Sequence, residues 1–510
     1  MNAPTQFKMY QPVGLEFLTP VAVGSGQTLD PTRYIMQSVR GREQFHLLDI
    51  ERYLMDNASE EGLISLLDRG DFRELRREIQ RRMKPKPERS DIDEYTLSVF
   101  EMLPGSEAYA SYDQDLNQSD TNKSFELDAA LRNPVTHRLI LPGSSLKGAI
   151  RTAVLDYLDR EHALELKKQM PSIEIRGRTK WDERKFNDAL ENLLGRIRDN
   201  DFKALQLNDF ELPAGDCLVV KPKEEGLKPT PSKRPRTPKN ACECIRGLAV
   251  DPTRPVRAYS RIGLGNMDSV QTLTVHQRSQ GIKQDEVLDW TKLCSLVTGF
   301  FRSRFDEEMK KFYKEPHLSE VASALKPVQD RIDRMEENEM LLRIGHYSHI
   351  ESMTLSDVDP EMQRTFRGGK SFLPGNTRTL ADGRFPFGWC ILGKSTDVEL
   401  TNWQENLRKG VVVEIKGAQP TTVAEPEIDP MQLLREDLNK ITDWGQVLQF
   451  MESRLMEITD EEIREELMNT TLEKVGTLPV SKKKLKQNPN LLEERLQQVR
   501  DGFTKEREED

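Results

Sequence analysis

Residues 141–155, LPGSSLKGAIRTAVL, constrain the fold more than any other stretch, because a strand has to end and a helix has to begin within a few residues. The apolar run at 137–141 predicts the strand, and the Pro-Gly pair after it predicts a turn. Ser144 or Ser145 can then cap the helix, because a serine hydroxyl accepts a hydrogen bond from a backbone N–H one turn on. The helical spacing predicts one core-facing row of side chains: Leu146, Ile150, Ala153, Val154, Tyr157 and Leu158.

A second face of this helix carries positive charge. Lys147 and Arg151 are four residues apart, so they share a face close to the helix N-terminus. A strand, a turn rich in glycine and serine, backbone N–H groups and two cations together favour phosphate binding. The spacing of Gly143 and Gly148 matches a nucleotide-binding P-loop, but Ala and Ile follow Gly148 where that loop needs Lys and Ser or Thr. The alternative is an ordinary helix with two solvated cations.

The order of residues around this turn resembles the signature loop of the RAMP superfamily of CRISPR proteins. The matching residues are 133–136, NPVT, and 141–152, LPGSSLKGAIRT. Residues 15–26, which include Gly24 and Gly26, resemble the first strand and glycine turn of that superfamily. Residues 30–35 and 45–54 narrow the resemblance to the fifth Csm subunit, the family that caps the guide 3′ end in type III-A Csm complexes. In all, the resemblance covers residues 8–60, 125–160, 205–220 and 340–395.

The resemblance implies an α+β fold with a ferredoxin-like (RRM-like) RAMP core of two units, helical insertions and a helical C-terminal extension. With 510 residues, the chain is long enough for two or three domains. We expect a first unit with a helical insertion over 1–165, a second RAMP-like region over 166–418, and a charged helical extension over 419–510. The basic, proline-rich stretch 221–240 predicts a disordered loop in the second region, which is either a surface insert or an arm for RNA phosphates.

Local patterns add further expectations. Strands are predicted over 11–18, 34–39 and 44–48, and Asp49 is a candidate cap for a short helix. The polar residues 104–124 predict a loop, and helical signals return from about Phe125.

Residues 367–394 form a second informative stretch, with glycine-rich turns and cations interleaved with aromatic residues. This mixture suits RNA, because cations pair with phosphates and rings stack on bases. The alternating rings of Phe385, Phe387 and Trp389 are better explained as the core face of a strand, whereas the arginines are candidates for RNA contact.

Together, these observations and the resemblance imply a non-catalytic subunit that binds the 3′ part of a CRISPR guide RNA near target RNA and supports guide maturation. The implied partners are the backbone and small subunits of the Csm complex and host nucleases that trim the guide. No cofactor or metal is expected. The candidate RNA-binding residues are Gly24, Gly26, Gly143, Ser144, Ser145, Lys147, Gly148, Arg151, Arg343, Lys370, Gly375, Arg378 and Arg384.

The acidic balance of the chain does not exclude RNA. The net charge is −10, but residues 425–510 carry 13 Lys and Arg against 21 Asp and Glu. The preceding residues carry 62 against 64 and are therefore nearly neutral. Such a body can hold a local basic groove, and RNA affinity depends on local neutralisation of phosphates.

Composition also argues against disulfide bonds, a metal site and a membrane span. Five cysteines are too few for a disulfide framework, and Cys242 and Cys244 lack a second pair at zinc spacing. His346 and His349 lie three residues apart without a carboxylate pattern, which makes a metal site there a weak hypothesis. No run of 18 apolar residues and no signal core is present, so we expect a cytoplasmic protein without a membrane span.

Two other functions stay open from the sequence. Some RAMP proteins are metal-independent ribonucleases, which need a general base near a 2′-hydroxyl group. The candidate bases are His46, His137, His346 and His349, of which His137 lies next to the 141–155 stretch. The backbone subunit of Csm complexes cleaves target RNA with an Asp in a loop, and residues 112–115 are a weaker candidate for that role because they match no known motif. The second alternative is a protein-only scaffold, which would have no need of Lys147 and Arg151.

Overall fold

The computed structural model describes most of the first 413 residues. It covers residues 10–413 except 40–41, 58–64, 66–68, 70–71, 83–94, 118–124, 167–171, 175–178, 182, 197–199, 227–239, 266–271, 278–280 and 357–376. These residues fall within one compact unit, Met1–Gly417. The predicted extension 419–510, with its helices, lies outside the described residues, as do Lys370 and Gly375.

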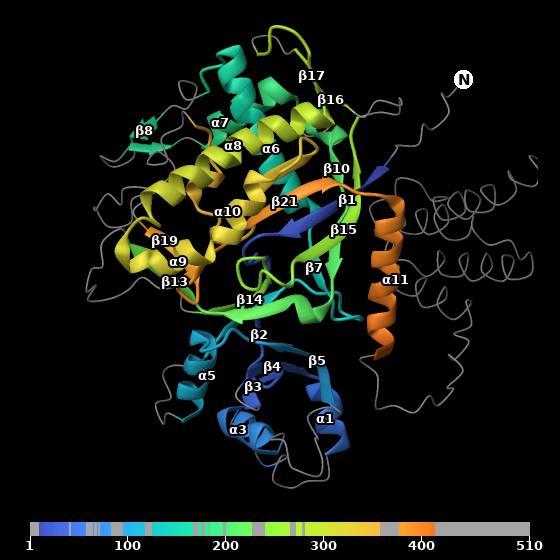
Figure 1. Ribbon diagram of the computed structural model, residues 1–510, viewed down its shortest axis with the longest axis vertical. Coiled ribbons are helices and arrows are strands. Elements are labelled where there is room, and N and C mark those ends of the chain that lie inside the picture. Colours follow the sequence, from blue (N-terminus) through green and yellow to red (C-terminus); the bar gives the residue numbers. More distant parts are fainter. Residues whose placement is uncertain are drawn as a thin grey trace, which may run out of the picture. The chain divides into compact units, whose positions relative to one another are not determined.

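The main sheet has β1 (Tyr10–Phe17) at its centre (Figure 1). Its strands are all antiparallel, in the order β10 (Gln206–Leu207), β15 (Val256–Gly263), β1, β21 (Trp389–Lys394), β18 (Glu339–Arg343). Leu15 lies opposite Ala258 on one side and Leu392 on the other. The sheet therefore joins strands from both sides of the expected domain boundary at 165/166.

Helices lie on both faces of this sheet. The apolar row Val13, Leu15 and Phe17 is fully buried on one face. Helix α8 (Trp290–Lys311) packs against β18, and α6 (Gly143–His162) packs against α8. The opposite face carries Tyr259, whose ring lies 5.8 Å from that of Trp403 on α11 (Asp397–Val413). Figure 1 shows α11 beside β15, and α11 also contacts β1.

A second sheet has the order β12 (Cys217–Val220), β14 (Ala241–Ile245), β6 (Leu127–Ala130), β2 (Gly24–Leu29). Strands β14 and β6 are parallel, and their register pairs Ala241 with Leu127. All of β12 and β14 is buried. By contrast, β2 is a largely exposed edge strand with an irregularity between Gly24 and Thr28.

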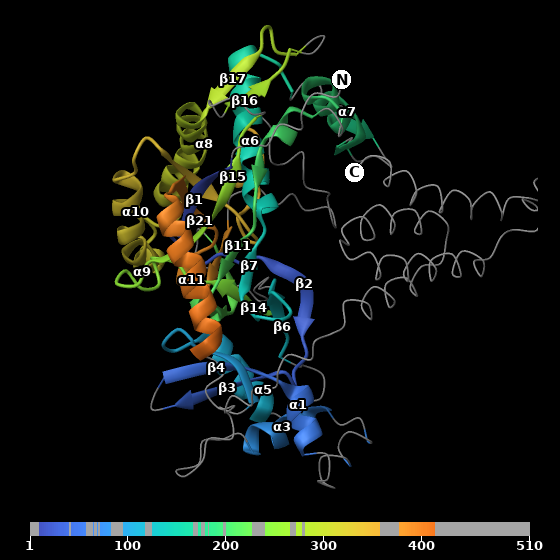
Figure 2. The ribbon, with the colours of Figure 1, turned by 90° about the vertical axis from the view of Figure 1, so that its right-hand side faces the viewer.

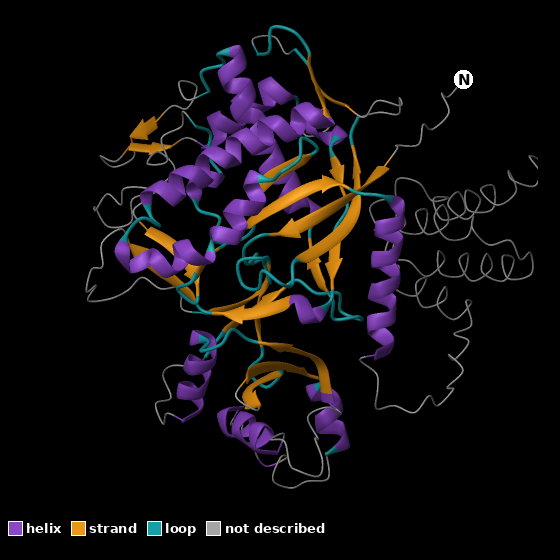
Figure 3. Cartoon of the chain, in the orientation of Figure 1, coloured by secondary structure: helices purple, strands orange, loops and turns teal. Residues whose placement is uncertain are grey.

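A smaller sheet near the N-terminus consists of β3 (Tyr34–Val39), β4 (Arg42–Leu48) and β5 (Thr96–Glu101), all antiparallel. Three helices accompany it: α1 (Ile50–Asp56), α3 (Phe72–Arg82) and α5 (Glu107–Asn117) (Figure 3). As predicted, the Asp49 carboxylate caps α1 by accepting a hydrogen bond of 3.1 Å from the Arg52 N–H.

The remaining elements are short. The strand pairs and small sheets are β7 (Leu139–Leu141) with β11 (Phe210–Leu212), β8 (Ser172–Glu174) with β9 (Thr179–Trp181), β16 (Thr272–Val275) with β17 (Glu286–Asp289), and β13 (Pro222–Gly226) with β19 (Thr377–Ala381) and β20 (Phe385–Pro386). The helices and 3₁₀ turns are α7 (Glu183–Leu194), α9 (Ser319–Ala324), α10 (Lys326–Asp333), η1 (Asp201–Ala204), η2 (Ala214–Asp216), η3 (Pro316–Leu318) and η4 (Ile350–Ser352).

Three local predictions are wrong. Part of the predicted loop 104–124 is helix α5, because Tyr112 is fully buried between the rings of Tyr34 and Phe125. The residues after Phe125 form strand β6 rather than a helix, since they pair with both β14 and β2. The first residues of the predicted basic loop form β13, which pairs with β19; residues 227–239 lie outside the described part.

The fold class is α+β, as predicted, with helices and mainly antiparallel sheets in separate layers. In the part of the chain that the structure describes, no helix is both long and apolar enough to cross a membrane.

Candidate nucleic-acid interface

The N-terminus of α6 follows β7 through Pro142, which has an extended backbone. In Figure 2, α6 runs upright from the end of β7. Neither Ser144 nor Ser145 caps this helix, contrary to the prediction. Instead, the Gly143 N–H donates a hydrogen bond of 2.8 Å to Oδ1 of Asp209. A carboxylate of the same chain thus occupies part of the positive helix end that we expected to bind phosphate.

Gly143 has a packing role. A Cβ atom at this position would lie 2.2 Å from the carbonyl oxygen of Leu207, which is far too close. The helix therefore begins in direct contact with the backbone beside β10. The fold therefore requires glycine at position 143, independently of any RNA contact at this helix end.

The turn before α6 is held by a buried ion pair. Arg132 donates to the His137 carbonyl oxygen at 2.9 Å and pairs with Glu243, whose side chain is fully buried in β14. Burial opposes the charge on Arg132, but the Glu243 carboxylate prevails and raises its pKa. The side-chain oxygen of Asn133 also accepts hydrogen bonds from the backbone N–H groups of Val135 and Thr136. The matching NPVT motif thus forms a fixed turn that positions the helix.

Arg151 is the most informative cation of α6. It is half-buried, its guanidinium carbon lies 6.0 Å from the centre of the Phe202 ring, and burial lowers its pKa. Among the described residues, no carboxylate lies within 4 Å of it. A partly desolvated arginine without an acidic partner keeps its donors available for an anionic ligand.

Gly148 lies between the two cations of α6. It is exposed, and a Cβ atom there would meet nothing within 4 Å. Glycine in an exposed helix interior costs about 1 kcal/mol relative to alanine, so its presence needs a reason other than packing. A bare helix surface beside Lys147 and Arg151 allows close approach of another backbone. Lys147 is half-buried, and Ser144 is exposed.

Gly24 and Gly26 lie at the exposed edge strand β2 of the second sheet. Gly26 has a positive φ of 78°, which glycine adopts without strain, and a Cβ atom there would meet nothing within 4 Å. Strand β2, which carries these glycines, pairs with β6. Strand β6 is followed in the chain by β7 and then by α6, so the glycines are connected to the helix through β6 and β7.

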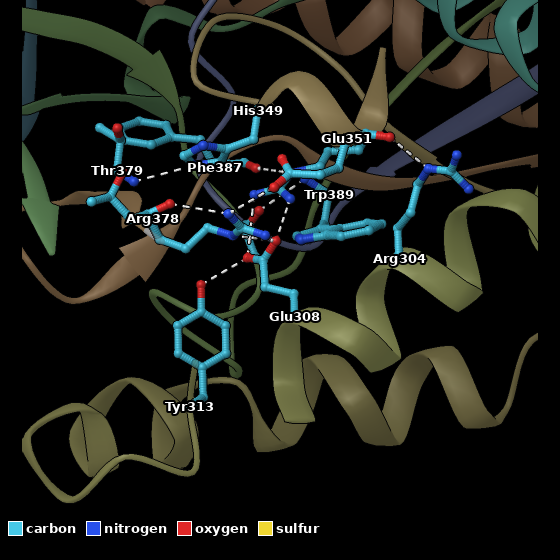
Figure 4. Close-up of polar contacts among 12 residues, drawn as sticks. Arg304, Glu308, Tyr313, His349, Glu351, Arg378, Thr379, Phe387 and Trp389 are labelled. Carbon is cyan, nitrogen blue, oxygen red and sulfur yellow. Dashed lines mark hydrogen bonds and ion pairs between the residues drawn. The ribbon is translucent and has the colours of Figure 1, made fainter. Parts of the chain in front are cut away.

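Arg343 and Arg378, two predicted RNA ligands, are interior residues. Figure 4 shows the Arg378 side chain at the Glu308 carboxylate. Their side chains are 2% and 7% exposed, and both pair with the buried carboxylate of Glu308 on α8. Burial opposes ionisation of Glu308, but the two guanidinium groups lower its pKa to about 2. These arginines are therefore occupied within the protein, and we remove them from the candidate interface.

Sequence reasoning missed this ionic cluster because its members are distant in the chain. Tyr313 donates a hydrogen bond of 2.8 Å to Glu308, and Arg378 lies 4.0 Å from the centre of the Phe312 ring. Arg304 donates to the carbonyl oxygens of Glu351 and Thr354. The cluster thus holds the segment before residue 357 and the strand after residue 376.

Arg384 also has a structural contact. Its guanidinium group donates to the carbonyl oxygens of Pro104 and Gly105 at 2.8 and 3.0 Å. The rings of Phe385, Phe387 and Trp389 are buried, which confirms their assignment to the core.

The candidate histidine bases are distributed over separate places. His46 is buried beside Gln37, and burial lowers the pKa of His137. His349 accepts a hydrogen bond from the Thr379 N–H at 3.2 Å, and the centre of the His346 ring lies 4.1 Å from that of Tyr347, with the two rings tilted. Within the described ranges, no group of three or more His, Cys, Asp or Glu side chains is placed to hold a metal ion. All five cysteines are buried free thiols.

Comparisons with known proteins add the family. No curated protein matches the chain. Among solved structures, a chain of the cryo-EM structure of a Csm–crRNA–target RNA ternary complex from a type III-A CRISPR-Cas system is similar, with 19% identity and a TM-score of 0.45 over 75% of this chain and 100% of that one. The crystal structure of T. onnurineus Csm5 is similar with 18% identity and a TM-score of 0.36, over 74% and 99%. The family model of the RAMP superfamily matches residues 14–331, which is more than half of the chain, and the chain therefore belongs to the RAMP superfamily.

Proposed function

We propose that this protein is a non-catalytic guide-RNA-binding subunit of a type III-A Csm effector complex, where it caps the filament at the guide 3′ end. The observation that carries RNA binding is the half-buried Arg151, which has no carboxylate within 4 Å among the described residues and lies one turn from the open surface of Gly148. The assignment to the 3′ end rests on the sequence resemblance in residues 30–35 and 45–54.

Binding at this face is positional. The guanidinium group of Arg151 and the ammonium group of Lys147 pair with backbone phosphates, and the bare surface of Gly148 admits the strand. Such contacts do not read bases, which suits a subunit that has to accept any guide sequence. Because Asp209 already neutralises part of the helix end, the cations of α6 carry more of the binding than its backbone N–H groups.

The first experiment measures binding of a labelled single-stranded guide RNA to the full chain over a range of salt concentrations. We compare the wild type with Lys147→Ala/Arg151→Ala and with Lys310→Ala/Lys314→Ala. The control removes the same charge from exposed lysines on and just after α8. We expect only the α6 variant to bind weakly, with a salt slope smaller by about 0.7 for each lost phosphate contact.

The same gel tests the alternatives, because it shows whether the RNA is cut. Intact RNA with lost binding supports the capping subunit, whereas cleavage by the wild type without added metal would favour the ribonuclease. An equal loss of RNA affinity in both double variants would show that RNA binding depends only on the net charge of the protein and not on the cations of α6. Absence of binding by the wild type would favour the protein scaffold. Co-purification with the backbone and small Csm subunits, and with nucleases that trim the guide, tests the proposed partners.

A further inference from the structure

A polar pocket lies at the main sheet, lined by residues of β15, β18 and β21 and by the C-terminal end of α10. Its volume is 510 Å³, which is in the usual range for small-ligand sites. Gly14 of β1 lies directly opposite Gly393 of β21, so neither strand carries a side chain at this one level of the sheet. The residues that line the pocket are Arg257, Arg331, Arg334, Glu336, Asn338, Glu339 and Lys394.

Balanced ion pairs form the floor of the pocket. One carboxylate oxygen of the buried Glu16 accepts from Arg257 and from Arg331, both at 3.1 Å. The terminal nitrogens of Arg331 bind both oxygens of Glu339. Burial opposes ionisation of Glu339, but the hydrogen bonds from Arg331 prevail and lower its pKa. The floor is thus rigid and contributes no net charge, because two arginines face two carboxylates.

The rim has a surplus of positive charge. Arg334 and Lys394 line the pocket, and within the described part of the chain neither has a carboxylate within 4 Å. Nε of Arg334 donates to the Asp330 carbonyl oxygen, and the Lys394 ammonium lies 5.9 Å from the centre of the Trp290 ring. Glu336 is the one lining carboxylate outside the floor pairs. A pocket with this charge pattern concentrates anions.

The remaining lining groups limit the ligand further. The Asn338 amide and the Glu336 carboxylate can exchange hydrogen bonds with hydroxyl groups. None of the seven lining residues is aromatic, so the pocket has no platform for stacking a base. We propose that this pocket binds a ribose-phosphate unit, with the phosphate between Arg334 and Lys394 and the sugar hydroxyls on Asn338 and Glu336. This unit belongs either to an RNA backbone or to a free nucleotide, and the site is separate from α6.

The test is titration calorimetry of the full chain with inorganic phosphate, ribose 5-phosphate and a 12-nucleotide RNA. We compare the wild type with Arg334→Ala/Lys394→Ala and with the charge-matched control Lys310→Ala/Lys314→Ala. Because the rim cations have no ion pair to lose, the first variant is expected to fold. We expect ribose 5-phosphate to bind more tightly than phosphate, and the rim variant to lose affinity by about tenfold or more. The control is expected to match the wild type.

Each outcome decides the proposal. A loss that affects ribose 5-phosphate but not RNA identifies a free-nucleotide site, whereas a loss of RNA affinity in the rim variant alone identifies the RNA backbone as the ligand. No saturable binding of ribose 5-phosphate together with RNA affinity equal to the control overturns the proposal, as does equal loss in both variants. The α6 variant keeps an intact pocket, so its result reports on the proposed function separately.

Discussion

The two terminal nitrogens of Arg343 donate to the two carboxylate oxygens of Glu308 in the interior of the protein. This pair joins β18 of the main sheet to α8, which covers it. Arg378 adds a second cation to the same carboxylate from β19. A single buried acid therefore connects three elements, and it has consequences for stability.

Replacement of Glu308 by Gln should destabilise the fold strongly. It leaves the buried guanidinium group of Arg343 without its carboxylate partner and leaves Arg378 with Glu351 alone, and breaking such a buried pair typically costs about 3–5 kcal/mol. Urea unfolding followed by circular dichroism measures the change. Glu307→Gln is the matched control, because Glu307 is the exposed neighbour on the same helix. A loss below about 1 kcal/mol would show that the cluster contributes little.

The same carboxylate should make stability depend on pH. Because the folded pKa of Glu308 is lowered to about 2, from an ordinary value near 4.5, its contribution is present in full above the unfolded pKa. It is lost progressively as the pH falls from about 5 towards 2, and its size is about 3 kcal/mol. The free-energy difference between the wild type and Glu308→Gln should therefore shrink between pH 6 and pH 3. A difference that stays constant over this range would contradict the lowered pKa.

The elements that the sequence predicted well are those with a local signal. The strands around residues 34–48, the Asp49 cap and the helix after residue 143 follow from periodicity, turn residues and capping chemistry over a few positions. Helix α5 was missed because its polar composition resembles a loop, and only the tertiary contacts of Tyr112 show its buried face.

The candidate site was predictable in part for the same reason. Lys147, Gly148 and Arg151 lie on one helix, so their spacing alone places them together. Arg343 and Arg378 were assigned to RNA because a sequence does not show which arginine has a buried partner. Glu308 lies 35 positions before Arg343, and no local pattern connects them. The cap of α6 was missed likewise, since Asp209 reaches it from beyond β10.

The two glycines of α6 should respond in opposite ways to substitution by alanine. Gly143→Ala places a Cβ atom 2.2 Å from the Leu207 carbonyl oxygen, so it should destabilise the fold by about 1–3 kcal/mol. Gly148→Ala meets nothing within 4 Å and should stabilise the helix by about 1 kcal/mol. If RNA approaches at this point, Gly148→Ala should also weaken RNA binding. Thermal unfolding and filter binding measure the two effects, and stabilisation with unchanged RNA affinity would place the RNA elsewhere.

Removal of the charge on Asp209 should strengthen RNA binding. Its carboxylate accepts the Gly143 N–H at the start of α6, on the helix that presents Lys147 and Arg151. Asp209→Asn keeps a hydrogen-bond acceptor at this place but removes a negative charge that repels phosphates. We expect RNA affinity to rise by about two- to fivefold at low salt, and the rise to disappear at high salt because of screening. The helix should lose about 0.3–1 kcal/mol of stability, because an anion at its positive end is removed. Glu211→Gln is the control, since Glu211 lies two residues away and pairs with Arg138 instead. Unchanged affinity in Asp209→Asn would mean that phosphates do not come close to the start of α6.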